Sequence, residues 1–118
     1  MILIDTASAV PPFEQLRVQL REQVTTGELA AGARLATVRR LAEDLGLAPN
    51  TVARAYRELE ADGIIETRGR NGTFVSAQGD VPSQQAQLAA RSFADRIRQL
   101  GVSPESALAW AKAALHDQ

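Results

Sequence analysis

The sequence predicts a mostly α-helical fold with one small β-hairpin, built on a single core in a chain of 118 residues. Two observations support this prediction. Apolar residues recur at spacings of three and four in several separate segments, which is the period of amphipathic helices. Ile64–Thr67 and Thr73–Val75 are rich in β-branched residues, and the Asn-Gly pair between them is a strong hairpin signal.

The first helix is expected to begin near Pro12, because proline suits the first helical position, and to end at Gly27. Residues 27–35 hold two glycines and two leucines and are predicted to form a packed turn rather than a flexible linker. Before the helix, Ile2–Ile4 is either a short edge strand or a tether. The stripe that predicts this helix consists of Phe13, Leu16, Leu20 and Val24.

The next two helices are predicted to form a helix-turn-helix. Thr37 is expected to cap the second helix, because its hydroxyl can accept from a backbone N–H two or three residues on. Gly46 is expected to end it, and Pro49 to open the third helix. At the helical rotation of about 100° per residue, the third helix has two faces. The buried face holds Val52, Ala55, Tyr56 and Leu59, and the opposite face holds Asn50, Arg54 and Arg57.

The exposed face of the third helix carries groups that suit nucleic acid. An amide can bind an adenine edge, and guanidinium groups bind guanine or phosphate. Arg39 and Arg40 lie in the first turn of the second helix, where the helix dipole disfavours positive charge unless an anion such as phosphate is near. The alternative is an ordinary solvated face. The formal net charge of −1 does not decide between the two.

The predicted hairpin favours the DNA-binding interpretation. Three helices followed by a hairpin form the winged-helix arrangement, in which the wing lies along phosphates or enters the minor groove. The loop Arg68–Gly72 holds two arginines. A phosphate-binding P-loop is the competing interpretation, but this loop lacks the lysine, the hydroxyl and the following helix that a P-loop needs.

Several short motifs occur together, namely Leu35–Ala42, Leu45–Leu47, Asn50–Val52, Ala55–Tyr56, Leu59, Gly63 and Gly72–Val75. As a set they resemble the DNA-binding domain of GntR-type bacterial transcription regulators, over roughly residues 10–76. The resemblance implies a winged helix that binds operator DNA as a dimer. It also implies DNA contacts from Arg39, from Pro49, Asn50 and Ala53, and from the wing tip near Asn71 and Gly72.

The chain departs from the family pattern at two places. Ala36-Thr37 replaces the usual Pro-Ser, and Thr37 can still cap. Ala48-Pro49 replaces a common Ser-Arg, which removes one cap and one DNA contact and shifts recognition toward other residues of the third helix. The run Pro-Asn-Thr-Val is similar to the YtrA-like branch of the family. The predicted DNA-binding residues are Thr37, Arg39, Arg40, Pro49, Asn50, Thr51, Arg54, Arg57, Arg68, Arg70, Asn71 and Gly72.

The last third of the chain is predicted to form two helices that dimerise. Residues 1–76 are assigned to the winged helix, 77–83 to a linker ending in the N-cap Ser83, and 84–118 to the tail. The second tail helix is apolar nearly all round and must be buried on more than one side. Dimerisation buries it, and two-fold symmetry matches a palindromic operator. The predicted dimer contacts are Phe93, Ile97, Leu100, Leu108, Trp110, Ala111 and Leu115.

The predicted function is therefore a homodimeric, sequence-specific DNA-binding regulator, with repression as the expected mode. The alternative is a winged helix that docks on a protein; a steep loss of affinity with salt would identify DNA binding. The tail is too short to enclose an effector pocket within one subunit, which leaves open an unidentified effector between subunits.

An enzyme is not expected from this sequence. Cysteine is absent and His116 is the only histidine, so neither a metal site nor a cofactor is predicted. The apolar runs are too short for a membrane span, and the first residues do not resemble a signal peptide. The protein is expected to stay in the cytoplasm.

Overall fold

Five α-helices, one 3-10 helix and two short strands make up the computed structural model, which describes residues 1–117. The predicted mostly helical fold with one hairpin is confirmed. The elements are α1 (Pro12–Thr25), α2 (Val38–Leu45), α3 (Pro49–Ala61), β1 (Ile65–Thr67), η1 (Gly69–Asn71), β2 (Thr73–Val75), α4 (Val81–Leu100) and α5 (Pro104–His116). Gln118, the last residue of the predicted tail, lies outside the described residues.

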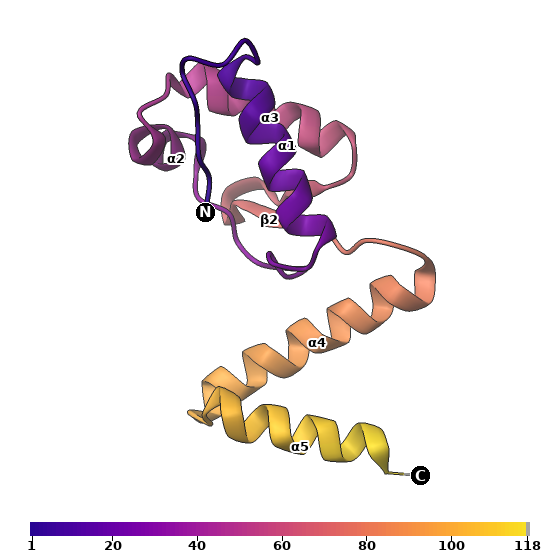
Figure 1. Cartoon of the computed structure of the whole chain (residues 1–118). Coiled ribbons are helices and arrows are strands. Elements are labelled where there is room, and N and C mark those ends of the chain that lie inside the picture. The colour runs from indigo at the N-terminus through magenta and orange to yellow at the C-terminus, as the bar shows by residue number, and fades with distance from the viewer. Residues whose placement is uncertain (118) are drawn as a thin grey trace.

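The molecule is elongated, with extents of 53 × 30 × 29 Å, because α4 and α5 project from the body formed by the other elements (Figure 1). These two helices meet in a V, and α5 folds back below α4. Among the described residues, no helix combines the length and the apolar character that a membrane span requires.

The core lies where α1 crosses α3 and the hairpin closes over both. Leu16 of α1 and Val52 and Leu59 of α3 are fully buried, and Val75 of β2 is 1% exposed. The predicted stripe of α1 is buried at its three aliphatic positions, whereas Phe13 is half-buried at the end of the helix. Burial of these side chains is the main stabilising contribution to the winged-helix body.

The hairpin has a third backbone partner that the sequence did not reveal. β1 and β2 pair antiparallel, with Ile65 opposite Val75. The segment before α2 adds to the other edge of β2, where the Leu35 N–H donates to the Thr73 carbonyl at 2.8 Å and the Val75 N–H to the Ala33 carbonyl at 2.9 Å. The predicted packed turn over residues 27–35 thus ends as a short strand-like edge, which anchors the wing to the start of α2.

The N-terminal segment is a tether rather than an edge strand. The Gln19 side chain accepts from the Leu3 N–H at 2.8 Å and donates to the Leu3 carbonyl at 2.7 Å, and Gln15 does the same for Asp5 at 2.8 and 2.9 Å. Gln15 and Gln19 are four residues apart on the helix, a rise of about 6 Å, and Leu3 and Asp5 are two residues apart in an extended segment, a rise of about 6.6 Å. The spacing of the two glutamines therefore matches the spacing of the two backbone positions that they bind. A ladder of glutamines on α1 therefore binds residues 1–5 as a neighbouring strand would.

The N-cap of α4 differs from the prediction. Asp80, not Ser83, occupies the cap position, and its carboxylate accepts from the Ser83 N–H at 2.9 Å. Both residue types can cap, but Pro82 fits the first turn of a helix that begins at Val81. The helix consequently starts inside the segment that was predicted as a linker.

Candidate nucleic-acid interface

Both predicted caps of α2 are present, one at each end of the helix. The Thr37 hydroxyl accepts from the Arg40 N–H at 3.1 Å, and Gly46 ends α2 with φ of 67°. That left-handed conformation suits glycine, which has no Cβ to clash. Ala48 precedes α3 and makes no side-chain cap, as expected from the replacement of serine. The short turn fixes the start of α3 beside the end of α2.

Tyr56 holds the two helices of the motif together. Its hydroxyl donates to the Ala36 carbonyl at 2.7 Å, and its side chain is 7% exposed. Burial raises the pKa of the Tyr56 phenol to about 12, so the group remains a neutral donor throughout the physiological range. Because Ala36 immediately precedes the cap of α2, this bond positions the first turn of α2 relative to α3.

The faces of α3 are those that the helical period predicted. Val52, Ala55, Tyr56 and Leu59 are buried, whereas Asn50, Arg54 and Arg57 are exposed. Pro49 is exposed at the first helical position and Thr51 is half-buried beside it. The first two turns of α3 therefore present polar side chains to solvent from a rigid, core-anchored helix.

Two arginines of the helix-turn-helix are engaged with other side chains of this protein. Arg40 Nε lies 3.1 Å from Asp44 Oδ1, one turn later in α2. Arg54 Nε lies 3.7 Å from Glu58 Oε2, and the Arg54 guanidinium stacks 3.6 Å from the centroid of the Phe13 ring. Arg54 is thus exposed on the flank of α3 that faces α1. A partner such as phosphate would have to compete with these contacts.

The wing is held at a defined distance from α3. The Glu60 carboxylate of α3 accepts from the Thr67 N–H at 3.1 Å. Arg68 Nη2 lies 2.6 Å from Glu66 Oε1, and its guanidinium stacks 4.3 Å from the centroid of the Phe74 ring. Arg70 projects from the exposed tip, within the 3-10 turn between the strands. These contacts place the wing beside α3 as a second polar surface.

Three of the predicted arginines have no such partner. Among residues 1–117, no ion pair within 4.0 Å involves Arg39, Arg57 or Arg70, and all three are exposed. They come from α2, α3 and the wing respectively. A shallow cleft of about 200 Å³ lies between α3 and the wing, and small Ala53 and Arg57 line it. The free cationic groups therefore belong to the three elements that a winged helix presents to DNA.

The comparison with known families supports this arrangement of elements. The family described as bacterial regulatory proteins, gntR family, matches residues 12–75, which span the three helices and the hairpin. The chain belongs to the GntR family. This confirms the resemblance on which the prediction was made.

Similar proteins place this GntR-family chain near the predicted branch. The HTH-type transcriptional regulator Rv1152 of Mycobacterium tuberculosis is 47% identical over 105 residues, which cover 89% of this chain and 86% of that protein. The HTH-type transcriptional repressor YtrA of Bacillus subtilis is 45% identical over 76 residues, covering 64% and 58%. YtrA from Sulfolobus acidocaldarius, a GntR-family transcription factor of known structure, has a TM-score of 0.61 at 28% identity, over 97% of this chain and 96% of that one. The predictions of a YtrA-like regulator and of a non-enzyme are confirmed.

The structure of this GntR-family chain also brings Arg34 to the wing, which the sequence did not predict. Arg34 is exposed, and its backbone pairs with that of Phe74 in an isolated antiparallel β-bridge. Its side chain lies close to the wing tip, because a Cβ at Gly72 would be 2.9 Å from Arg34 Nε. Gly72 has φ of 112° and offers no side chain to block this approach. Arg34 reaches the wing through pairing between distant segments, so no local pattern in the sequence indicates it.

The predicted dimer contacts lie on α4 and α5. Five of them are exposed apolar side chains, whereas Ile97 and Ala111 are half-buried. Ala107 is the buried residue of α5, and none of the side chains in α4 is buried within the described chain. The exposed fractions are 43% for Phe93, 56% for Leu100, 71% for Leu108, 61% for Trp110 and 84% for Leu115.

The described residues do not contain a cluster suited to a metal ion. No group of three or more His, Cys, Asp or Glu side chains within residues 1–117 has a metal-binding arrangement.

Proposed function

We propose that this GntR-family regulator binds a palindromic operator as a homodimer, with α3 in the major groove and the wing on phosphates or in the minor groove. The observation that carries the proposal is the set of three exposed arginines, one each on α2, α3 and the wing, that form no ion pair among residues 1–117. An exposed arginine that forms no ion pair keeps its donors available for phosphate or guanine.

Each element has a distinct proposed role. Asn50 and Arg57 point outward from α3 and suit base edges, and Ala53 between them leaves room for the groove wall. Arg39 and Arg70 suit the phosphates that flank the groove. The full proposed set is Thr37, Arg39, Arg40, Pro49, Asn50, Thr51, Arg54, Arg57, Arg68, Arg70, Asn71 and Gly72. We add Arg34 to this set because it lies beside the wing tip.

The homodimer is supported by the apolar side chains of the tail. Leu108 and Leu115 lie two helical turns apart in α5 and are 71% and 84% exposed. An apolar surface of this kind in a monomer generally indicates an interface. A second copy would bury it, and an isologous pair would present two recognition helices related by a two-fold axis, as a palindrome requires.

Repression in the cytoplasm is the proposed mode of action. The similar Bacillus subtilis protein is named a repressor. A dimer on its operator can act by covering the DNA, which requires no catalytic chemistry. Operator DNA in a bacterium lies in the cytoplasm, so a regulator that binds it acts there.

Selection from a pool of random duplexes by the purified full chain tests the proposal. The recovered sequences should share two inverted half-sites, and their spacing should match a dimer measured by light scattering. If Arg39 and Arg70 of each subunit bind phosphates, log Kd should change with log salt with a slope of about 4. A pool without enrichment, or binding indifferent to salt, would reject DNA as the partner and favour a protein-docking module.

A further inference from the structure

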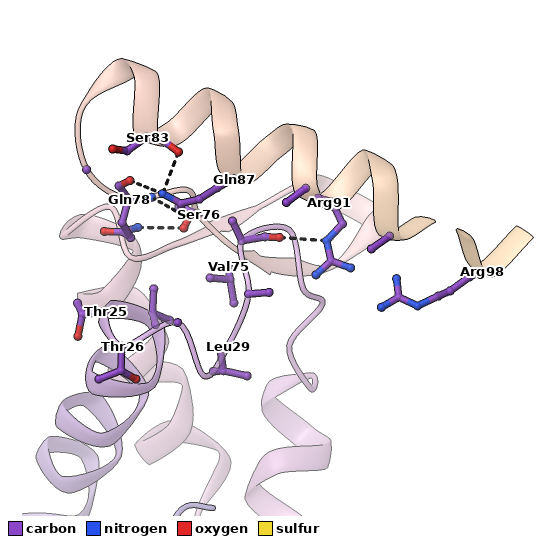
Figure 2. A pocket seen from close by; sticks show the side chains of 17 residues that line it. Thr25, Thr26, Leu29, Val75, Ser76, Gln78, Ser83, Gln87, Arg91 and Arg98 are labelled. Atoms are coloured by element: carbon purple, nitrogen blue, oxygen red, sulfur yellow. Dashed lines mark hydrogen bonds between the residues drawn. The ribbon is translucent and has the colours of Figure 1, made fainter. Parts of the chain in front are cut away.

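A cleft lies between the winged-helix body and α4. It has a volume of about 710 Å³ and extends from the end of α1 and the following turn to one face of α4 (Figure 2). This volume is in the range of small-molecule sites, which is roughly 300–1,000 Å³. The cleft is open on one side, so it differs from the enclosed pocket that the short tail rules out.

The two ends of the cleft differ in chemistry. Val24, Leu29 and Val75 from the body, with Ala90 and Ala94 from α4, supply an apolar floor. The amides near the start of α4 are already occupied, because Gln87 accepts from the Gln78 N–H at 3.2 Å and donates to the Gln78 carbonyl at 2.6 Å.

Arg91 and Arg98 lie at the other end of the cleft. Their guanidinium groups approach the same region of the cleft in Figure 2. Within residues 1–117, the lining contains these two arginines and no acidic residue. Asp95, outside the lining, is the one carboxylate that serves both: its Oδ1 lies 3.7 Å from Arg91 Nη1 and 3.2 Å from Arg98 Nη1. Two cations share one anion, which leaves an uncompensated positive charge and several free N–H donors.

We infer that this cleft binds a small organic anion with an apolar body, such as a carboxylate on a hydrocarbon chain. The carboxylate accepts hydrogen bonds from Arg91 and Arg98, for which the fork of a guanidinium is well shaped. The hydrocarbon part covers the floor formed by Ala90, Ala94 and Val75.

The position of the cleft connects ligand binding to the proposed DNA binding. Arg91 Nε donates to the Ala31 carbonyl at 3.0 Å, and a Cβ at Gly32 would lie 2.9 Å from Arg91 Cγ. One arginine therefore seats the tail helix on the body. A ligand that draws the guanidinium toward itself changes the angle between body and tail, and with it the spacing of the two recognition helices in a dimer. This regulatory consequence rests on the proposed function, whereas the binding site does not.

Calorimetric titration of the full chain without DNA tests the site. Octanoate and 1-octanol serve as probes, because they share a chain length and differ in charge. Octanoate should bind once per subunit, at least about tenfold more tightly than 1-octanol, since hydrogen bonds to a charged group contribute more than neutral ones. Arg98→Gln should abolish that difference. Arg96→Gln removes the same charge from the same helix at a residue outside the cleft lining, and should bind octanoate as the original chain does.

Three outcomes would overturn the site. These are no saturable binding of octanoate, equal affinity for the two probes, or equal losses in Arg98→Gln and Arg96→Gln. Ala94→Leu fills the floor and should weaken both probes while the protein stays dimeric. If light scattering shows that this variant dissociates instead, the cleft is a subunit interface and not a ligand site.

Operator binding with and without octanoate tests the regulatory step. The operator affinity of the original chain should change by several-fold when octanoate is present, and that of Arg98→Gln should not. An unchanged affinity in a protein that binds octanoate rejects the regulation and leaves the site. A protein that binds octanoate but no DNA rejects the proposed function alone, so the two failures are distinguishable.

Discussion

Arg57→Ala separates DNA recognition from folding, because this side chain has no ion-pair partner among residues 1–117. Arg57 is exposed on α3 and forms no ion pair within the described chain. Its removal should therefore change the free energy of unfolding by no more than about 0.5 kcal/mol. A lost contact to a base or phosphate should reduce the free energy of DNA binding by about 1–3 kcal/mol per half-site, which is about 5- to 150-fold in Kd.

Arg54→Ala is the matched comparison on the same helix. Arg54 stacks on Phe13 and pairs with Glu58. An exposed cation–π contact contributes about 0.5–1 kcal/mol, and an exposed ion pair one turn apart about 0.3–0.5 kcal/mol. Arg54→Ala should thus lower the free energy of unfolding by about 1 kcal/mol, and weaken DNA binding less than Arg57→Ala does.

Fluorescence anisotropy with the selected operator, and urea unfolding monitored by circular dichroism, measure the two effects. Arg96→Ala in α4 controls for the change in net charge. If Arg57 binds a phosphate, the salt slope should fall by about 0.9 per subunit; if it binds a base, preference at one operator position should relax. Unchanged operator affinity in Arg57→Ala, or a larger loss in Arg54→Ala, would refute the assigned orientation of α3 on DNA.

Three further predictions follow from individual contacts. Tyr56→Phe removes the bond to Ala36 and should lower the free energy of unfolding by about 1 kcal/mol at pH 8. Because the pKa of Tyr56 is about 12 when folded against 10.0 normally, its contribution is complete below pH 10 and is lost as pH rises through 12. Urea midpoints should therefore fall faster between pH 10 and about 12 in the original chain than in the variant; parallel curves would contradict this. Gln19→Ala removes both bonds to Leu3, so hydrogen exchange at the Leu3 amide should accelerate while Val52 stays protected, and equal acceleration at both would refute a local tether. Leu108→Asp with Leu115→Asp should give a folded monomer by light scattering; a persistent dimer would disprove the role of α5.

Local rules predicted the parts of this fold that local physics determines. The period of α3 identified its buried face, because Val52 and Leu59 alternate with polar residues at helical spacing. Thr37 and Gly46 satisfy backbone groups within their own turns, so their residue types alone indicated the caps. The predicted N-cap of α4, Ser83, was wrong because local rules alone do not choose between Asp80 and Ser83. Both residue types can cap a helix, and only the position at which the helix starts distinguishes them.

The parts that the sequence did not predict depend on contacts between distant residues. Arg34 reaches the wing through pairing with Phe74, and Arg91 reaches the carbonyl of Ala31, 60 positions earlier. Neither position carries a motif. The cleft is formed only when α4 lies across the end of α1, so its lining residues read individually as ordinary polar and small residues of surface helices.

The ion pairs reconcile a net charge of −1 with DNA binding. Asp44, Glu58 and Glu66 each lie beside an arginine of the proposed DNA-binding set. Non-specific affinity depends on the number of phosphates that a protein neutralises, and arginines engaged with their own acids contribute less to it. Arg39, Arg57 and Arg70 form no ion pair among residues 1–117 and lie on three different elements. They can bind together only where groove and backbone have the correct geometry. The ion pairs therefore lower the affinity for arbitrary DNA more than the affinity for a matching operator. In this way a nearly neutral chain remains selective.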